Sequence, residues 1–360
     1  MNNQKNILVA PLDWGLGHAT RCMPLINLLI EKKHNIIIAG NGDSFLLLKK
    51  TYPTLTFFEL PAYNIKYESG KNAAVQSLLQ TPKILRTIKA ENKAIKQFIE
   101  QAQIDLIISD NRYGVRHENI KSIFICHQIA LQAPKPFQWM NAFFLKLHLR
   151  QIQKFDELWI PDVETENNLS GKLSHQINFG ITHKYIGIQS RFLNYNPTVS
   201  FIENIDFDVL VVLSGVEPQR SSLEKKLIEK FQERKEKVLL IQGKTATLTQ
   251  TSISNITIIS YLETNDLFVA MKKADCIICR SGYSTVMDLA ALGKKAIFIP
   301  AEGQTEQEYL AETLTTKGFS VMCESNNLDL ETAMEKIKLC RGFGKLKTDN
   351  QRLEDFLKRI

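Results

Sequence analysis

The stretch CRSGYSTVMDLAALGKKAIFIPAEGQTEQEYLAETL, at residues 279–314, decides the fold of the second half of the chain. Apolar β-branched runs alternate here with segments of helical periodicity, which predicts strand, turn, helix, strand, loop and helix in that order. Ser281 and Gly282 fall at the turn between the first strand and its helix. This alternation is typical of a parallel sheet covered by helices.

The same alternation extends over most of the 360 residues. In the first half the predicted strands are NILVAP, NIIIAG, LTFFEL, DLIISD, SIFICH and ELWIPD. In the second half they are DVLVVLSG, KVLLIQG, NITIIS, DCIICRSG, KAIFIP and FSVMCE. Because a single hydrophobic core stops growing at roughly 250–300 residues, we predict two doubly wound α/β units in tandem.

The boundary between the units falls where the alternation becomes irregular and Asn, Gly, Tyr and Pro gather around FLNYNPT. We predict a first unit over residues 1–165, a linker and hinge over 166–203, a second unit over 204–345 and a C-terminal helix over 346–360. This last helix is compatible with packing on either unit.

The composition is that of a globular protein, with 44% hydrophobic and 23% charged residues. No apolar run approaches the ~20 residues of a membrane span, and the N-terminus does not open a signal peptide, so we expect a cytoplasmic protein. The net charge of +7 favours anionic partners, including nucleotide phosphates and acidic lipid surfaces. The basic residues are dispersed without an aromatic-basic pattern, which argues against nucleic-acid binding.

Six cysteines lie in or beside apolar runs, where a thiol behaves as a small hydrophobic group. Cys276 and Cys279 form a Cys-x-x-Cys pair, but the strand that holds them directs the two side chains to opposite faces. Because the sequence has no second pair, we predict neither a metal site nor a redox site.

The first predicted strand leads into the loop PLDWGLGHATRCMPL, residues 11–25. Gly15 and Gly17 permit a tight turn before a helix, and this turn presents His18 at the edge of the sheet. A dinucleotide-binding loop would carry a third glycine where Thr20 stands, and the second strand ends without an acidic residue. A nicotinamide or flavin site is therefore disfavoured.

Asp110 ends a strand of the same half, so its loop opens at the same edge as His18. A carboxylate on one imidazole nitrogen orients the ring and raises its basicity, which lets the other nitrogen take a proton from a hydroxyl. The alternative is that His18 is structural and that Asp110 caps the loop DNRYG.

In the stretch that decides the fold, Ser281 and Gly282 precede the helix, and Ser284 and Thr285 lie in its first turn. Free backbone N–H groups, hydroxyls and the helix dipole converge there, which makes an anion site suited to a diphosphate. Asp288 lies one turn further on, where it can reach the hydroxyl pair of a ribose.

The following loop and helix carry Gln304, Gln307 and Glu308, which offer the donors and acceptors that suit sugar hydroxyls. Each of these features also has an ordinary explanation. A Ser-Gly turn is a common helix cap, and Gln-Glu runs usually solvate a helix face.

Together these residues resemble the donor-binding segment of family 28 glycosyltransferases and of related GT-B transferases of the glucuronosyl and plant glycoside type. The family is typified by the enzyme that adds N-acetylglucosamine to a lipid-linked muramyl peptide. The resemblance extends to GLGH at residues 15–18, LSGVEPQR at 213–220 and SYLETNDLFVAMKKADCIICRSG at 260–282. It implies a GT-B fold, two Rossmann-like domains facing across a cleft, with the acceptor on the first domain and a UDP-sugar on the second.

By position, the resemblance assigns the backbone of Leu262 to the base, Asp288 to the ribose, residues 281–285 to the diphosphate, and Gln307 with Glu308 to the sugar. It further implies that His18 is the base and Asp110 its supporting acid.

The resemblance also implies a phosphate loop with Ser214, Gly215 and Arg220. That loop is normally richer in glycine, whereas this chain has Val216, Glu217 and Pro218.

The implied reaction is a direct displacement at the anomeric carbon that inverts its configuration, with helix N-termini stabilising the leaving diphosphate. No Asp-x-Asp pair offers the oxygen ligands that would hold Mg²⁺ or Mn²⁺ against the diphosphate. We therefore expect activity without metal, with the UDP-sugar as a co-substrate and no further cofactor. Two rival functions are a UDP-N-acetylglucosamine 2-epimerase and a non-catalytic sugar-nucleotide-binding or scaffold protein.

The segment PFQWMNAFFLKLHLRQIQKF places aromatic residues among Lys and Arg, as an interfacial amphipathic helix does. It indicates a peripheral contact through residues 137–155 with the inner membrane face and a lipid-linked acceptor. Ordinary helix packing explains the same pattern.

Overall fold

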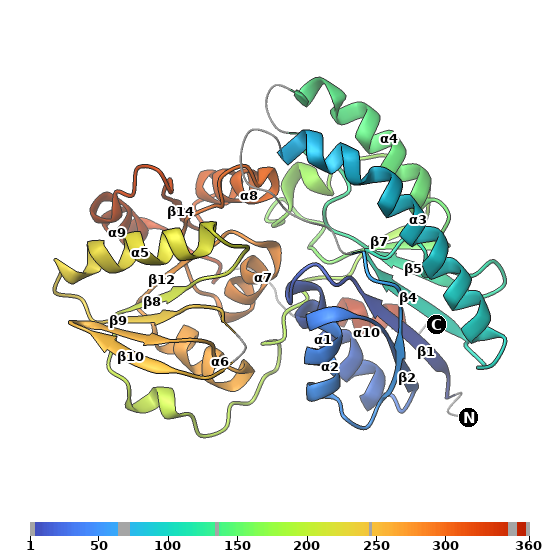
Figure 1. The fold of residues 1–360 in the computed structure, drawn as a ribbon, viewed down its shortest axis with the longest axis horizontal. Helices are drawn as coiled ribbons and strands as arrows, with labels where there is room; N and C mark the ends of the chain where they lie inside the picture. Colours follow the sequence, from blue (N-terminus) through green and yellow to red (C-terminus); the bar gives the residue numbers. More distant parts are fainter. Residues whose placement is uncertain (1–3, 64–72, 134–136, 245–246, 345–350, 358–360) are drawn as a thin grey trace. The chain divides into compact units, whose positions relative to one another are not determined.

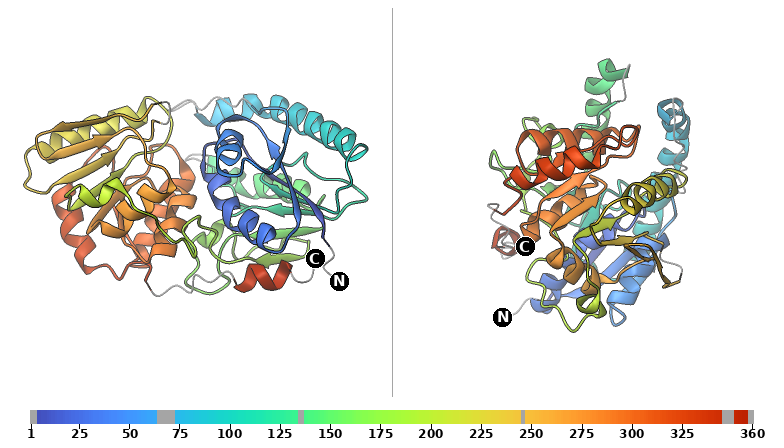
Figure 2. Two further views of the ribbon diagram at one scale, coloured as in Figure 1. Left: turned by 90° about the horizontal axis from the view of Figure 1, so that it is seen from below. Right: turned by 90° about the vertical axis from the view of Figure 1, so that its left-hand side faces the viewer.

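The computed structural model describes residues 4–63, 73–133, 137–244, 247–344 and 351–357. The chain divides into two compact units, Met1–Arg191 with Asp349–Ile360, and Phe192–Thr348. Each unit is a seven-stranded sheet between layers of helices (Figure 1, Figure 2).

The sheet of the first unit has the order β3-β2-β1-β4-β5-β6-β7, and all its neighbouring strands are parallel. Its strands are β1 (Asn6–Pro11), β2 (Asn35–Gly40), β3 (Thr56–Glu59), β4 (Leu106–Asp110), β5 (Ser122–Ile125), β6 (Glu157–Ile160) and β7 (His183–Tyr185). The direction of winding reverses between β1 and β4, which is where open α/β sheets place their ligands.

The helices of this unit are α1 (Gly17–Glu31), α2 (Gly42–Thr51), α3 (Ala73–Ile99), α4 (Asn141–Ile152) and α10 (Gln351–Leu357), with 3-10 turns η1 (Phe137–Met140) and η2 (Gly171–Leu173). Right-handed crossovers put α1 and α2 on one face of the sheet and α3 and α4 on the other (Figure 1). Ile7 and Val9 pack toward α1 and α2, whereas Leu8 and Ala10 pack toward α3.

The sheet of the second unit has the order β10-β11-β9-β8-β12-β13-β14. Its strands are β8 (Val209–Val212), β9 (Val238–Ile241), β10 (Gln250–Ile253), β11 (Ile256–Ile259), β12 (Cys276–Cys279), β13 (Ala296–Phe298) and β14 (Val321–Met322). Its helices are α5 (Gln219–Gln232), α6 (Thr264–Lys273), α7 (Tyr283–Leu292), α8 (Thr305–Thr316) and α9 (Leu330–Leu339), with the 3-10 turn η3 (Phe201–Asn204). Helices α5 and α9 pack on one face of the sheet, as their shared apolar core shows.

The predicted fold class is confirmed, and every predicted run contains a strand. Two strands were not predicted. β10 is an exposed, antiparallel edge strand of sequence QTSI, so it lacks the apolar signal of a buried strand. β7 is a three-residue edge strand inside the predicted linker.

The predicted linker is divided between the two units. Residues up to Arg191 belong to the first unit, because β7 pairs with β6 and because the buried Asp162 carboxylate accepts backbone N–H bonds from Leu169 and Ser170. Phe192 begins the second unit and stacks edge-on against Phe268. Segment 166–203 is therefore folded in the structure rather than open linker.

The C-terminal helix packs on the first unit, which settles the alternative that the sequence left open. Leu353 and Leu357 of α10 are buried in the core beneath α1. Residues 346–350 and 358–360, which the prediction included in this helix, lie outside the described residues. Among the helices of the described ranges, none has the length and hydropathy that crossing a membrane requires.

A buried polar network ties together several loops of the first unit. Arg112 is fully buried and donates to Glu91 Oε1 at 2.8 Å, to Asn41 Oδ1 at 2.7 Å and to the Pro11 carbonyl at 3.0 Å. The buried Glu91 also accepts from the Tyr63 hydroxyl at 2.6 Å. Hydrogen bonds and ion pairs of Arg112 therefore connect the ends of β1, β2 and β4 to helix α3.

Replacing Glu91 by Gln keeps the shape of the side chain but removes the nearer of the two carboxylates paired with the buried guanidinium, because Asp13 Oδ1 lies 3.6 Å from Arg112 Nη2. We expect the free energy of unfolding of the first unit to fall by about 1–3 kcal/mol. All three tryptophans of the chain, Trp14, Trp139 and Trp159, lie in this unit, so their fluorescence during denaturation reports on it alone. The exposed control Glu100→Gln should change little; equal midpoints for both variants would contradict the role of the network.

Candidate active site

The carboxyl ends of β1 and β4 are adjacent in the first sheet, where Pro11 pairs with Asp110. The loop after β1 turns at Gly15, whose φ of +77° favours glycine, and α1 begins at Gly17. His18 thus lies in the first turn of α1, beside the end of β4. The structure brings the two predicted residues together, with His18 Nδ1 at 3.2 Å from Asp110 Oδ1.

The Asp110 carboxylate is fully buried and has a second, closer partner. Arg21, one turn after His18 on α1, donates from Nε to Asp110 Oδ2 at 2.7 Å and from Nη2 to Asp110 Oδ1. Arg21 is itself buried, and its Nη1 lies 2.8 Å from His127 Nδ1. The Cys22 thiol completes the cluster at 3.4 Å from Asp110 Oδ2.

The electrostatics of this cluster follow from the buried ion pair. Burial alone would raise the pKa of Asp110, but the charge of Arg21 and the contacts with His18 hold that pKa well below its ordinary value. Burial, and then the charge of Arg21, lower the pKa of His18. Asp110 is therefore an anion and His18 a neutral imidazole at pH 7.

Arg21 and His127 were not predicted as site residues. Arg21 lies three residues after His18, a spacing that puts both side chains on one face of α1, and this is the signal that the sequence contained. The sequence disfavoured a dinucleotide site because no acidic residue ends the second strand. In the structure, the residue that follows β2 is Asn41. Its side chain is buried and accepts from Arg112, where a ribose-binding acid would stand.

In the second unit, the predicted donor residues come from loops at one edge of the sheet. β11, β9, β8, β12 and β13 are consecutive parallel neighbours, so their carboxyl ends share that edge. Leu262 follows β11, Ser214 and Gly215 follow β8, Ser281 and Gly282 follow β12, and Gln304 follows β13.

The N-terminus of α7 is open. Gly282 is its N-cap, no side chain caps it, and its first turn holds no acidic residue. A Cβ atom built on Gly282, Gly215 or Gly303 would meet nothing within 4 Å, so space lies above all three loops. Ser284 and Thr285 lie in the first turn, and Asp288, 6% exposed, follows on the same helical face.

The predicted sugar-binding residues form hydrogen bonds that hold the loop after β13. Gln307 Oε1 accepts from the Ala301 N–H at 3.0 Å, and Gln307 Nε2 donates to Gln304 Oε1 at 2.6 Å. Glu308 accepts from the Gly303 N–H at 2.8 Å, and the buried Ser281 hydroxyl donates to the Gln307 carbonyl at 2.7 Å. The loops after β12 and β13 are thereby fixed to each other.

The α5 terminus differs from that of α7, because a carboxylate already lies there. Glu217 accepts from the Ser221 N–H at 3.2 Å and the Ser221 hydroxyl at 3.0 Å, and it forms an ion pair with Arg220. Arg220 also donates to the Gly243 carbonyl at 2.9 Å. The predicted phosphate-binding arginine is therefore already paired with an anion of the chain.

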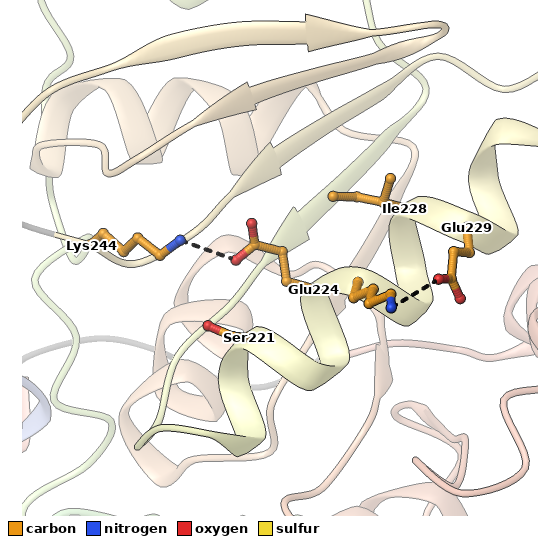
Figure 3. A pocket seen from close by; sticks show the side chains of 6 residues that line it. Ser221, Glu224, Ile228, Glu229 and Lys244 are labelled. Carbon is orange, nitrogen blue, oxygen red and sulfur yellow. Dashed lines mark ion pairs between the residues drawn. The ribbon is translucent and has the colours of Figure 1, made fainter.

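A shallow pocket runs beside α5, next to the predicted donor loops (Figure 3). It is lined by Ser221, Glu224 and Lys244 among others, and the Glu224 carboxylate lies 3.5 Å from Lys244 Nζ. Because its charges are paired with each other, this pocket offers no counter-charge for a phosphate.

The Cys-x-x-Cys pair lies in the buried strand β12, and burial raises the pKa of Cys276 to about 11. Cys276 packs in the core under α5, so it is a core side chain.

Asp206 and Asp208, which form an Asp-x-Asp sequence, precede β8 at the opposite edge of the sheet, and each contacts Lys237. Within the described ranges, no three His, Cys, Asp or Glu side chains are grouped as a metal site.

Comparisons with known proteins agree with this architecture. Residues 209–359 match the family model "Glycosyltransferase family 28 C-terminal domain". The chain is 40% identical over 75 residues to the N-acetylglucosamine transferase acting on N-acetylmuramyl-(pentapeptide) pyrophosphoryl-undecaprenol from Histophilus somni, a match that covers 21% of each protein. It is 23% identical over 339 residues to an uncharacterized glycosyltransferase from Methanosarcina acetivorans, covering 86% of this chain and 83% of that one.

Among solved structures, the glycotransferase of kitacinnamycin superposes with a TM-score of 0.67 at 12% identity, over 99% of both chains. The protein is therefore a glycosyltransferase of the GT-B fold. The match to the family 28 C-terminal domain covers most of the second unit together with α10.

We expect that Glu217→Gln strengthens the binding of a nucleoside diphosphate, because it removes a negative charge from the α5 terminus and releases Arg220. Glu217 is half exposed, so the gain should be about 0.5–1 kcal/mol, or roughly two- to fivefold in Kd by calorimetry. Glu229→Gln, further along α5, is the matched control. Weaker binding by the Glu217 variant would instead make this carboxylate an organiser of the loop.

Proposed function

We propose that the protein transfers a sugar from a UDP-sugar to an acceptor hydroxyl, with inversion at the anomeric carbon and without a metal ion. The observation that carries the proposal is the order of the loops across the second sheet. Across the sheet, the loop after β11 is assigned to the base, the loops after β8 and β12 to the diphosphate, and the loop after β13 to the sugar. They span four strand spacings, or about 19 Å.

The open N-terminus of α7 is the favoured position for the diphosphate. Its uncapped N–H groups carry a partial positive charge, whereas α5 and α8 already have the carboxylates of Glu217 and Glu308. The sugar then lies toward Gln304 and Gln307, so the anomeric carbon falls between these amides and α7. The leaving diphosphate gains its negative charge beside the helix terminus, which lowers the barrier to bond breaking.

In the proposed reaction, the acceptor oxygen attacks the anomeric carbon while the bond to the diphosphate oxygen breaks. The electron pair of that bond leaves with UDP, and the acceptor proton passes to His18 Nε2. His18 is suited to this step because it is neutral at pH 7 and 14% exposed, with Nδ1 directed toward Asp110. Metal independence is supported by the α7 terminus, whose N–H groups supply positive charge to the diphosphate.

We expect UDP to bind in the presence of a metal chelator, and more tightly than GDP or dTDP, as measured by calorimetry. Asp288→Ala should weaken the binding at least tenfold, about 1.4 kcal/mol, because it removes the proposed ribose contact. Asp275→Ala, an exposed site before β12, is the matched control. A folded Asp288 variant that binds UDP normally would remove Asp288 from the site, and failure of every nucleotide to bind would overturn the proposal.

Two assays separate this function from its rivals. Conversion of UDP-N-acetylglucosamine in the absence of any acceptor would identify a 2-epimerase. If His18→Gln leaves every measured activity and binding property unchanged, the result favours a non-catalytic sugar-nucleotide-binding or scaffold protein.

We further propose a lipid-linked acceptor at the inner membrane face, to which the protein docks through residues 137–155. Leu145, Leu149 and Ile152 pack in the core, so helix packing explains one face of this segment. It does not explain the other face. Trp139, Phe143 and Leu147 follow each other at four-residue spacing and form an apolar stripe whose side chains are 79%, 55% and 41% exposed. The exposed cations Lys146, Arg150 and Lys154 form a second stripe beside it, also at four-residue spacing.

We expect the protein to float with vesicles that contain anionic phospholipid and to lose most of this binding in high salt. Replacing Trp139, Phe143 and Leu147 together by Ser should abolish flotation, because it removes the apolar stripe. Leu46→Ser with Leu339→Ser, two exposed positions elsewhere, should leave flotation unchanged. Absence of binding by the unmodified protein would exclude the docking surface while leaving the UDP proposal intact.

A further inference from the structure

Two side chains compete for one nitrogen of His18. Nδ1 lies 3.2 Å from Asp110 Oδ1 and 2.8 Å from Arg21 Nη2. A guanidinium donates hydrogen bonds and accepts none, so the shorter contact is attractive only when Nδ1 has a free lone pair. In a neutral imidazole the hydrogen is then on Nε2.

The other tautomer fits this arrangement less well. A hydrogen on Nδ1 would face an N–H of Arg21, which places two donors against each other. Its available acceptor, Asp110 Oδ1, is the more distant partner and already accepts from Arg21 Nη2, while Oδ2 accepts from Arg21 Nε. Arg21 therefore both neutralises Asp110 and occupies the nitrogen through which Asp110 would orient the ring.

We propose that Arg21 is a positioning residue that holds His18 as its Nε2–H tautomer in the protein without substrate. The catalytic meaning of this inference rests on the proposed function. To accept a proton at Nε2, His18 must first take a proton from water on Nδ1 and release the Nε2 hydrogen to water, so its net charge is unchanged. Arg21 Nη2 must leave Nδ1, and the imidazole ring must then direct the new Nδ1–H to Asp110.

The titratable groups around His18 come from three elements. Arg21 of α1 and Asp110 at the end of β4 contact His18 directly, whereas Cys22 of α1 contacts Asp110 and His127 after β5 contacts Arg21. Of these, only Asp110 favours the protonated imidazole, and the charge of Arg21 opposes it. Removal of Arg21 should therefore change both the tautomer and the basicity of His18.

The test is nitrogen NMR of the whole protein labelled with ¹⁵N-histidine, in which shifts distinguish protonated from unprotonated ring nitrogens. The His18 signals are identified by their loss in His18→Gln. His148 supplies an internal reference, because its Nδ1 lies 2.9 Å from the Ile129 carbonyl and must donate to it. We expect His18 to show the opposite pattern, with Nδ1 unprotonated; an Nδ1–H pattern in the unmodified protein overturns the proposal.

Arg21→Gln should move the hydrogen of His18 to Nδ1 and raise its pKa by about one unit or more, since Asp110 is no longer neutralised. His175, which lies 3.3 Å from Asp162 Oδ2, should not change. Arg21→Lys, which keeps the charge, should keep the pKa low. An unchanged His18 spectrum in the folded Gln variant also overturns the proposal.

If Arg21→Gln does not fold, the spectrum of the unmodified protein still decides, because it requires no variant at Arg21. In an active enzyme, the acid limb of the profile of kcat/KM against pH should shift upward in Arg21→Gln by the same amount as the pKa. The predicted tautomer without any transferase activity would reject the proposed function and keep this inference.

Discussion

The parallel arrangement of the strands is the constraint on which the rest of this structure depends. Parallel neighbours can be joined only through crossovers, so the loop after every such strand emerges at the same edge. In the first unit this edge brings His18 next to Asp110, which lies 92 residues later in the sequence, and it also holds Arg112. In the second unit it aligns loops that begin near Ser214, Leu262, Ser281 and Gln304.

The two edges use charge in opposite ways. The first unit buries complete ion pairs, Arg21 with Asp110 and Arg112 with Glu91, and these fix loops and tune a histidine. In the second unit, α7 begins at the N-cap Gly282, which has no side chain to cap it, and its first turn holds no acidic residue, so its dipole remains available to an external anion. The first edge is thus suited to handling a proton and the second to holding a phosphate.

The sequence allowed the buried strands to be predicted because buried parallel strands are almost wholly apolar, whereas the edge strands β7 and β10 were missed. For the same reason, the proximity of His18 and Asp110 was accessible, since each follows a strand of one sheet. Arg21 was missed because an arginine within an apparently apolar helix gives no sign of which carboxylate it meets. The roles of Glu217 and Asn41 were missed because both depend on a neighbour distant in sequence or on how a loop folds back.

The packing of α10 on the first unit makes Phe192–Thr348 an insertion within another domain, because the chain leaves the first unit after Arg191 and re-enters it at Asp349. A fragment ending at Arg191 would lack Leu353 and Leu357 and would expose the apolar surface that they cover. Autonomous folding of the first unit therefore calls for its two segments to be spliced, whereas the second unit is continuous and can be excised as one piece. Exchange of either unit of this chain therefore needs cuts at both junctions of the second unit and not a single cut at the midpoint.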